Sequence, residues 1–336
     1  MIFTSEMNRA DILEALASPD TAELFAAADR VRRECVGDAV HLRGLIEFSN
    51  ICARDCLYCG IRASSRTVAR YRMDVDEIFE TAKTAAGLGY KTLVLQSGEN
   101  DRYPLIAMCL LVRRIKAELG IALTLSMGEK TKEEYAALRS AGADRYLLRF
   151  ETSSEALFAR LKPDSSYAAR MQCLRWLKEV GFQVGSGIMV GLPGQTPDIL
   201  TDDILQMKAL DLDMIGIGPF IADPRTPLGA IASGTLALTL KVVALLRILT
   251  RNTHIPATTA MGSIEKGGRE QALRCGANVL MPNVTPTRYR QHYQLYPGKI
   301  CINDAPGDCR NCVAGMLRTL GRTVATDAGH SLKIQL

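Results

Sequence analysis

The sequence predicts a complete (β/α)8 (TIM) barrel, because apolar runs typical of strands alternate with amphipathic helical stretches along most of its 336 residues. Several helical stretches stop at a glycine just before the next strand, namely at Gly89, Gly120, Gly142, Gly181 and Gly276. There are eight strand candidates: Val40–Glu47, Thr92–Gln96, Ala122–Ser126, Arg145–Arg149, Gln183–Val190, Met214–Ile217, Ile255–Thr259 and Asn278–Met281. The count of eight favours a closed barrel over an open doubly wound sheet.

Helix candidates separate these strands. They cover Asp76–Leu88, Tyr103–Leu119, Lys132–Ala141, Ser154–Val180, Asp198–Leu210, Thr239–Thr250 and Gly267–Cys275. Residues 8–36 are also predicted to be helical, and no linker rich in Pro, Gly or Ser divides the chain. We therefore expect one domain over 1–336, with N-terminal helices at 1–38, the barrel at 39–290 and a C-terminal segment at 291–336.

Composition narrows the functional class. Hydrophobic residues make up 47% and charged residues 23%, which is ordinary for a folded globular chain. The net charge of +5 is too mild to indicate nucleic acid or a membrane surface as a partner. We find no apolar run long enough to cross a bilayer and no signal peptide at the start, so we expect a cytoplasmic protein.

Ten cysteines are many for a reducing compartment, where disulfides are rare, so metal ligation or burial must account for them. Six of them form two tight groups, at 52–59 and 301–312. Four stand alone in apolar, helical surroundings and are predicted to be small buried side chains: Cys35, Cys109, Cys173 and Cys275.

The first group comprises Cys52, Cys56 and Cys59, on the loop after the first strand and therefore at the face where barrel active sites lie. Three thiolates can hold a [4Fe–4S] cluster and leave one iron open, which S-adenosylmethionine (SAM) can chelate through its amino and carboxylate groups. Electron transfer into the sulfonium then gives a 5′-deoxyadenosyl radical. The alternative is a structural zinc site, which normally has a fourth ligand that is missing nearby.

The second group is Cys301, Cys309 and Cys312, in a stretch that contains Pro306 and Gly307 and could turn its ligands toward one metal. It is predicted to bind a [2Fe–2S] cluster with a non-cysteine fourth ligand, or a zinc ion. An unmetallated surface hairpin is the alternative.

These motifs carry a family resemblance. CxxxCxxC with Tyr58 between its last two cysteines is the radical SAM signature. With the strings His41–Asn50, Val94–Glu99, Asp144–Arg149, Val190–Gln195, Ile215–Phe220, Ile255–Met261 and Tyr296–Cys301, the chain resembles the HydE family of [FeFe]-hydrogenase maturases from about residue 40 to 312.

The resemblance implies a radical SAM enzyme that helps to assemble the diiron subsite of the hydrogenase H-cluster. It implies a small cysteine-ligated iron carbonyl cyanide substrate made by the maturase HydG, a scaffold HydF that receives the product, and an external electron donor. It also implies a set of SAM contacts: Tyr58, Ser97, Gly98, Glu99, Glu151 and Arg170.

Polar strand ends supply the substrate candidates. Arg149 and Glu151 are two residues apart, so on a strand both would face the barrel mouth, and the resemblance makes Arg149 an anion contact for the substrate. A structural Arg149–Glu151 ion pair is the alternative. The remaining strand-end candidates are small hydroxyls, namely Thr124, Ser126, Thr258 and Thr259. The resemblance adds Met214 and Tyr293 as cavity residues, although Met214 could instead be core.

Two other functions stay open. One is a related radical SAM enzyme, similar to biotin synthase or methylornithine synthase, that acts on a small amino-acid-derived substrate. Biotin synthase, however, holds its second cluster with cysteines on its barrel strands, and here the strand candidates carry no cysteine. The other is a non-catalytic scaffold for an iron–sulfur cluster or zinc, which would have no need of a SAM pocket.

Overall fold

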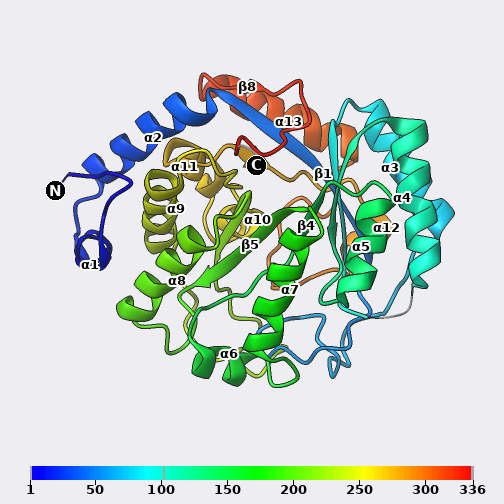
Figure 1. Cartoon of the computed structure of the whole chain (residues 1–336), viewed down its shortest axis with the longest axis horizontal. Coiled ribbons are helices and arrows are strands. Elements are labelled where there is room, and N and C mark those ends of the chain that lie inside the picture. Colours follow the sequence, from blue (N-terminus) through cyan, green and yellow to red (C-terminus); the bar gives the residue numbers. More distant parts are fainter. Residues whose placement is uncertain (1, 101–102, 334–336) are drawn as a thin grey trace.

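The protein, described by a computed structural model over residues 2–100 and 103–333, is a curled sheet of parallel strands wrapped by helices (Figure 1). The strands are paired in the order β6-β5-β4-β3-β2-β1-β7, and a short β8 pairs with β1. Their bounds are β1 Ala39–Ser49, β2 Thr92–Ser97, β3 Ala122–Ser126, β4 Arg145–Leu147, β5 Gln183–Val190, β6 Met214–Pro219, β7 Val279–Leu280 and β8 Thr323–Val324.

Two isolated bridges link the ends of this sheet. Met214 on β6 pairs with His254, and Pro256 pairs with Val279 on β7, so residues 254–256 stand where the seventh barrel strand was expected. The predicted regular strand Ile255–Thr259 is wrong, because Pro256 has no N–H for a ladder and Thr258 already caps the next helix. The barrel order of the other seven candidates is confirmed.

The helices surround the sheet. They are α1 Arg9–Ala17, α2 Ala22–Val36, α3 Val75–Gly87, α4 Leu105–Leu119, α5 Lys132–Ser140, α6 Glu155–Leu161, α7 Tyr167–Glu179, α8 Pro197–Ala209, α9 Leu236–Thr250, α10 Thr259–Ile264, α11 Gly268–Arg274, α12 Thr287–Arg290 and α13 Pro306–Thr319. Two predicted helices are each divided, 8–36 near Pro19 and 154–180 near Pro163, because proline disfavours a continuous helix. No helix of the described residues is long and apolar enough to span a bilayer.

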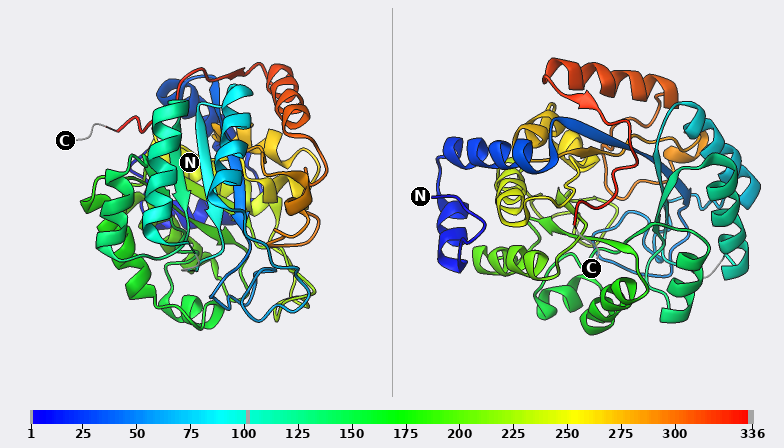
Figure 2. Two further views of the ribbon diagram at one scale, coloured as in Figure 1. Left: turned by 90° about the vertical axis from the view of Figure 1, so that its right-hand side faces the viewer. Right: turned by 45° about the horizontal axis from the view of Figure 1, so that its top comes forward.

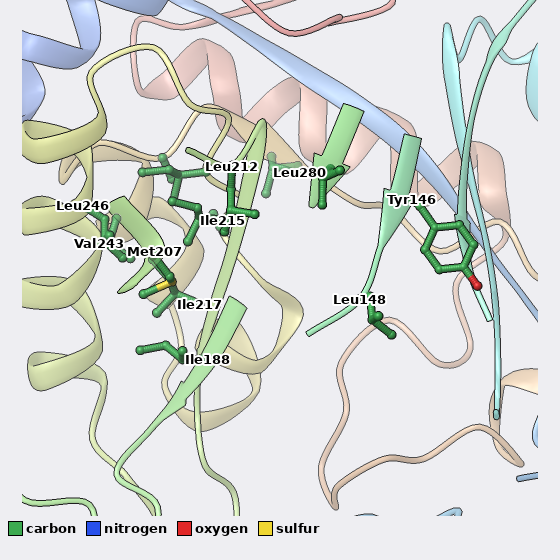
Figure 3. Close-up of a cluster of buried hydrophobic side chains, with 14 of the residues drawn as sticks. Tyr146, Leu148, Ile188, Met207, Leu212, Ile215, Ile217, Val243, Leu246 and Leu280 are labelled. Carbon is green, nitrogen blue, oxygen red and sulfur yellow. The ribbon is translucent and has the colours of Figure 1, made fainter. Parts of the chain in front are cut away.

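The main core lies between the strands and the outer helices. On β6, Ile215 and Ile217 point away from the barrel axis toward Met207 of α8 and Val243 of α9, and all four are fully buried (Figure 3). Residues of a strand alternate between its two faces, so Met214 points inward. The outer face thus supplies packing, and the inner face is left for polar side chains.

The end of the chain covers the N-terminal end of the barrel. After α13, β8 pairs with the start of β1, and residues 327–331 then run across the strand starts (Figure 2). The Ala328 carbonyl accepts a hydrogen bond from the Thr92 hydroxyl at 2.7 Å, and the Gly329 carbonyl accepts one from Arg145 at 2.9 Å. This tail closes one end of the barrel, whereas the loops of the opposite end carry the cysteine motif.

Candidate active site

The loop from Asn50 to Met73, which follows β1, carries Cys52, Cys56 and Cys59; we refer to it as the cluster loop. Asn50 closes its base: the side-chain amide donates to the Ala69 carbonyl at 2.8 Å and to the His292 carbonyl at 2.7 Å. The same side chain accepts from the Tyr71 N–H at 2.8 Å. One buried amide therefore holds the two ends of the loop together and ties them to the C-terminal segment.

Three backbone hydrogen bonds dock the cluster loop on its neighbours. Ala53 N–H donates to the Glu99 carbonyl at 2.7 Å, and Leu57 N–H donates to the Leu161 carbonyl at 2.9 Å. Gly60 N–H donates to the Leu295 carbonyl at 2.9 Å.

The last of these contacts requires glycine, since a Cβ at Gly60 would lie 2.3 Å from the Gln294 carbonyl oxygen. The loop after β2, the end of α6 and the C-terminal segment thus meet at the cluster loop.

The thiols sit in a shielded environment. Burial raises the pKa of Cys56 and of Cys59, which disfavours their free thiolates. Within residues 2–100 and 103–333, no three His, Cys, Asp or Glu side chains lie close enough to hold one metal ion. Three soft sulfur ligands on one loop suit an iron–sulfur cluster.

Four charged side chains form a network beside this loop. Arg54 contacts Glu99 at 2.5 Å and Glu129 at 2.9 Å, and Arg170 of α7 contacts Glu129 at 2.8 Å and Glu99 at 3.4 Å. The structure thus brings together Glu99 and Arg170, which the sequence singled out, with Arg54 and Glu129, which it did not. Glu129 follows the end of β3, and Arg54 lies inside the cysteine motif, so both could have been suspected.

The network offers both signs of charge at the edge of the site. A free amino acid end carries an ammonium and a carboxylate, which carboxylates and guanidiniums can bind respectively. This donor and acceptor set fits the amino acid end of SAM.

Arg149 and Glu151 form the ion pair that was the alternative interpretation of these residues. The Arg149 Nη2 lies 3.0 Å from Glu151 Oε2, and it also donates to the Ile188 carbonyl at 2.6 Å. The expectation that both stand on a strand is wrong, because β4 ends at Leu147. Glu151 has φ of 67°, a left-handed conformation that is uncommon for a residue with a side chain and concentrates at functional sites.

The loop after β2 comes very near the cluster loop. Gly98 N–H donates to the Ser49 carbonyl at 2.9 Å, and a Cβ at Gly98 would lie 2.4 Å from the Ile51 carbonyl oxygen. The Ser97 hydroxyl donates to the Gly98 carbonyl at 2.8 Å. Only glycine permits this approach, which leaves backbone oxygens of the β2 loop at the site.

Tyr58 anchors the cluster loop on a small separate apolar cluster. It packs against the buried side chains Leu157, Leu161 and Phe220. Burial raises the pKa of its hydroxyl well above the ordinary range, so the phenol stays neutral. Its position supports a role in excluding water from the adjacent cysteines.

The predicted substrate residues do not form one group. Thr124 and Met214 line a pocket in the half of the barrel nearer the strand starts, together with Arg43, Arg145 and His254. The Thr124 hydroxyl is buried without a hydrogen-bond partner among the described residues. Arg43 Nη1 donates to the Met214 sulfur at 2.8 Å, so Met214 is both packed and part of a polar pocket.

The other hydroxyl residues lie nearer the strand ends. Ser126 is the last residue of β3 and pairs in register with Gln96. The Thr258 hydroxyl donates to the Ile217 carbonyl at 2.9 Å, and Thr259 is the first residue of α10. The predicted place of Thr258 and Thr259 at the end of a regular strand is therefore wrong, although Thr258 still lies beside β6.

Tyr293 is held over the barrel by buried polar contacts. Gln96 Nε2 donates to its hydroxyl at 3.2 Å, and Lys299 Nζ donates to its carbonyl at 3.2 Å. Lys299 also forms a buried ion pair with Glu47 of β1. The sequence indicated Tyr293 but neither Glu47 nor Lys299.

The second cysteine group lies partly on a helix. Pro306 begins α13, which carries Cys309 and Cys312, so the expected turn or hairpin is wrong. A hydrogen bond from the Cys301 thiol lowers the pKa of Cys309, while Cys312 is exposed. The structure thus brings Cys301 and Cys309 together.

Of the four isolated cysteines, three are buried as predicted, Cys109, Cys173 and Cys275. The prediction for Cys35 is wrong, because this residue is only half-buried. It lies on α2, outside the site described above.

Comparisons with known proteins agree with this geometry. A family model described as the Radical SAM superfamily matches residues 46–206. The [FeFe] hydrogenase maturase subunit HydE of Thermotoga maritima is 52% identical over 332 residues, which cover 98% of this chain and 95% of that protein. The 3-methylornithine synthase of Methanosarcina acetivorans is 30% identical over 276 residues, covering 80% and 78% of the two chains.

A solved structure shows the same fold. The crystal structure of methylornithine synthase (PylB) superposes with a TM-score of 0.83 at 26% identity, over 95% of this chain and 94% of that one. Together with the matches above, this makes the protein a radical SAM enzyme that uses a [4Fe–4S] cluster and SAM. The chain belongs to the HydE family of the radical SAM superfamily.

Proposed function

We propose that this protein is the maturase that acts on the diiron precursor during assembly of the [FeFe]-hydrogenase H-cluster. The observation that carries the proposal is the 52% identity to HydE, which extends over 98% of the chain and so includes the barrel interior as well as the cysteine motif. In this proposal Cys52, Cys56 and Cys59 hold the cluster. The cluster and SAM, when bound, supply a 5′-deoxyadenosyl radical.

The residues around the cluster loop bind and orient SAM in this proposal. Glu99 and Glu151 offer carboxylates to its ammonium, and Arg170 offers a guanidinium to its carboxylate. Ser97 and Gly98 bring the backbone of the β2 loop to the same place, and Tyr58 shields the cysteines from water.

The barrel interior supports an anionic substrate. Arg43 and Arg145 are almost completely buried, and neither forms an ion pair with a residue in the described part of the chain. Burial lowers the pKa of Arg145 to about 10, which still leaves it charged at neutral pH. Two buried guanidiniums favour an iron carbonyl cyanide complex with a cysteine carboxylate, which also carries negative charge. Thr124 and Met214 line the same pocket as these arginines. The other proposed substrate contacts lie nearer the strand ends: Ser126, Arg149, Thr258, Thr259 and Tyr293.

A second candidate function is the rearrangement of a small amino-acid-derived substrate. It is favoured by the 30% identity to 3-methylornithine synthase and by the closely similar barrel of that enzyme. Four further features belong to the first candidate function and stay predictions. They are the partners HydG and HydF, an external electron donor, a cytoplasmic location, and a metal at Cys301, Cys309 and Cys312.

The test is complementation of a strain that makes [FeFe]-hydrogenase but lacks its HydE gene. We expect this protein to restore hydrogen evolution and Cys56→Ser to abolish it. The matched control Cys35→Ser, a half-buried thiol outside the cluster loop, should restore it fully. Failure of the wild-type protein, expressed and cluster-loaded, would contradict the maturase function. Conversion of an amino acid with SAM cleavage by the same preparation would then favour the second candidate.

A further inference from the structure

Lys162 is a buried cation for which none of the roles above accounts. It follows the last residue of α6, and only 6% of the residue is exposed. Its Nζ forms no hydrogen bond or ion pair with a residue of the described ranges; its charge lies 5.2 Å from the centroid of the Phe158 ring. A buried ammonium without an acceptor is unfavourable, so in the working enzyme we expect it to face an anion.

The chain around Lys162 is docked directly on the cluster loop. The carbonyl of Leu161 accepts from Leu57 N–H, next to Cys56, at 2.9 Å. The Asp164 carboxylate accepts from the N–H of Asp55 at 3.1 Å, so hydrogen bonds flank Lys162 on both sides. Figure 1 shows α6 beside the loop that follows β1.

The charges around Lys162 point to the cysteines. The Lys162 ammonium lies close enough to interact electrostatically with the sulfurs of Cys56 and Cys59. The other charged groups that act on Lys162 are Arg170, Glu151 and Glu99. Both carboxylates already pair with arginines, which leaves the cysteine sulfurs as the remaining anionic groups of this set.

We propose that Lys162 is a positioning residue whose ammonium lies against the Cys56 side of the [4Fe–4S] cluster and raises its reduction potential. An external low-potential donor adds one electron, and hence one negative charge, to the cluster without forming or breaking a bond. A fixed cation nearby in a poorly solvated site stabilises the reduced state more than the oxidised one. This inference rests on the proposed cluster site at Cys52, Cys56 and Cys59.

The experiment is an anaerobic redox titration of the cluster-loaded protein, followed by the EPR signal of the reduced cluster. We expect Lys162→Met to lower the ratio of reduced to oxidised cluster about tenfold at a given potential, which is a shift of about 59 mV for one electron. Lys162→Arg keeps the charge and should titrate like the wild type. Lys241→Met is the matched control, a lysine of α9 that donates to the backbone carbonyls of Leu16 and Ser18.

An unchanged midpoint in Lys162→Met with an intact cluster would overturn the inference. If Lys162→Met does not load a cluster, Lys162→Gln takes its place. Loss of the cluster in both neutral variants, with retention in Lys162→Arg, would show that the positive charge at position 162 stabilises the bound cluster, as the proposal requires. Loss of the cluster in all three variants would contradict the proposal. A wild-type protein that holds no SAM-responsive cluster would refute the cluster site itself, which is a different result.

Discussion

The buried ion pair between Glu47 and Lys299 ties the C-terminal segment to the first barrel strand. The side chains are 2% and 8% exposed, and Asn283 Nδ2 donates to the second carboxylate oxygen of Glu47 at 2.8 Å. Lys299 follows Leu295, whose carbonyl binds the cluster loop, and its ammonium also binds the Tyr293 carbonyl. Replacing Lys299 should therefore affect both stability and the site.

The size of the effect follows from burial. Lys299→Met leaves the Glu47 carboxylate buried without its cation, which costs about 3–5 kcal/mol. Unfolding a chain of 336 residues has an entropy of about 0.7 kcal/mol/K, from about 2.1 cal/mol/K per residue. The melting temperature should thus fall by about 4–7 °C. Glu47→Gln with Lys299→Met removes both charges of this pair, so the double variant should lose less than the sum of the two single variants.

The assay is anaerobic scanning calorimetry of the wild type, both single variants and the double variant. Lys83→Met, an exposed lysine of α3, is the control for removal of a lysine charge and should melt within about 1 °C of the wild type. The reasoning is refuted if Lys299→Met melts as the control does, or if the losses of the two single variants simply add.

Three further changes test other parts of the structure. Gly98→Ala places a Cβ against a backbone carbonyl, so it should weaken SAM binding at least tenfold in a titration of the cluster's EPR signal. The control Gly87→Ala places its Cβ in open space and should bind SAM like the wild type, and equal affinities of the two variants would contradict the close approach at Gly98. Burial lowers the pKa of His254, so below pH 6.5 the unfolded chain takes up a proton that the fold does not. Between pH 7.5 and 5.5 this group should lower the free energy of unfolding by about 1.4 kcal/mol. Burial also lowers the pKa of His41 and of His330, which adds a loss of the same sign. Calorimetry at the two pH values should therefore show a loss that is smaller by this amount in His254→Gln, and an equal loss in both proteins would refute the assignment. Gly329 has φ of 57°, and a Cβ there would lie 2.5 Å from the His41 ring. Gly329→Ala should therefore speed hydrogen exchange of residues 326–333, and unchanged exchange would contradict the packing of the tail.

The barrel could be predicted because its signals are local. Alternating strand and helix periods, together with glycines such as Gly120 and Gly181 that take positive φ at helix ends, mark each unit. The prediction was wrong where one residue changed the local geometry. Pro256 interrupts the seventh strand, and the left-handed Glu151 places the Arg149 contact beyond the end of β4. The single domain over 1–336 stays a prediction.

The site was only partly predictable, because its contacts join segments far apart in the chain. The cysteine motif is compact, but its hydrogen bonds to Leu161 and Leu295 join residues more than a hundred positions apart, which no local pattern reveals. Arg43 and Arg145 were missed although a charged residue on the inner side of a barrel strand is unusual. The tail across the strand starts has no sequence signature, since its carbonyls make the contacts.

The most direct test of the radical SAM mechanism at Cys52, Cys56 and Cys59 is the reductive cleavage of SAM. The reconstituted protein, reduced anaerobically with dithionite, should release 5′-deoxyadenosine, and SAM should change the EPR signal of its cluster. Cys56→Ser should do neither, and Cys35→Ser should match the wild type. Absence of 5′-deoxyadenosine and of any SAM-induced change in a wild-type protein with a full cluster would contradict the account.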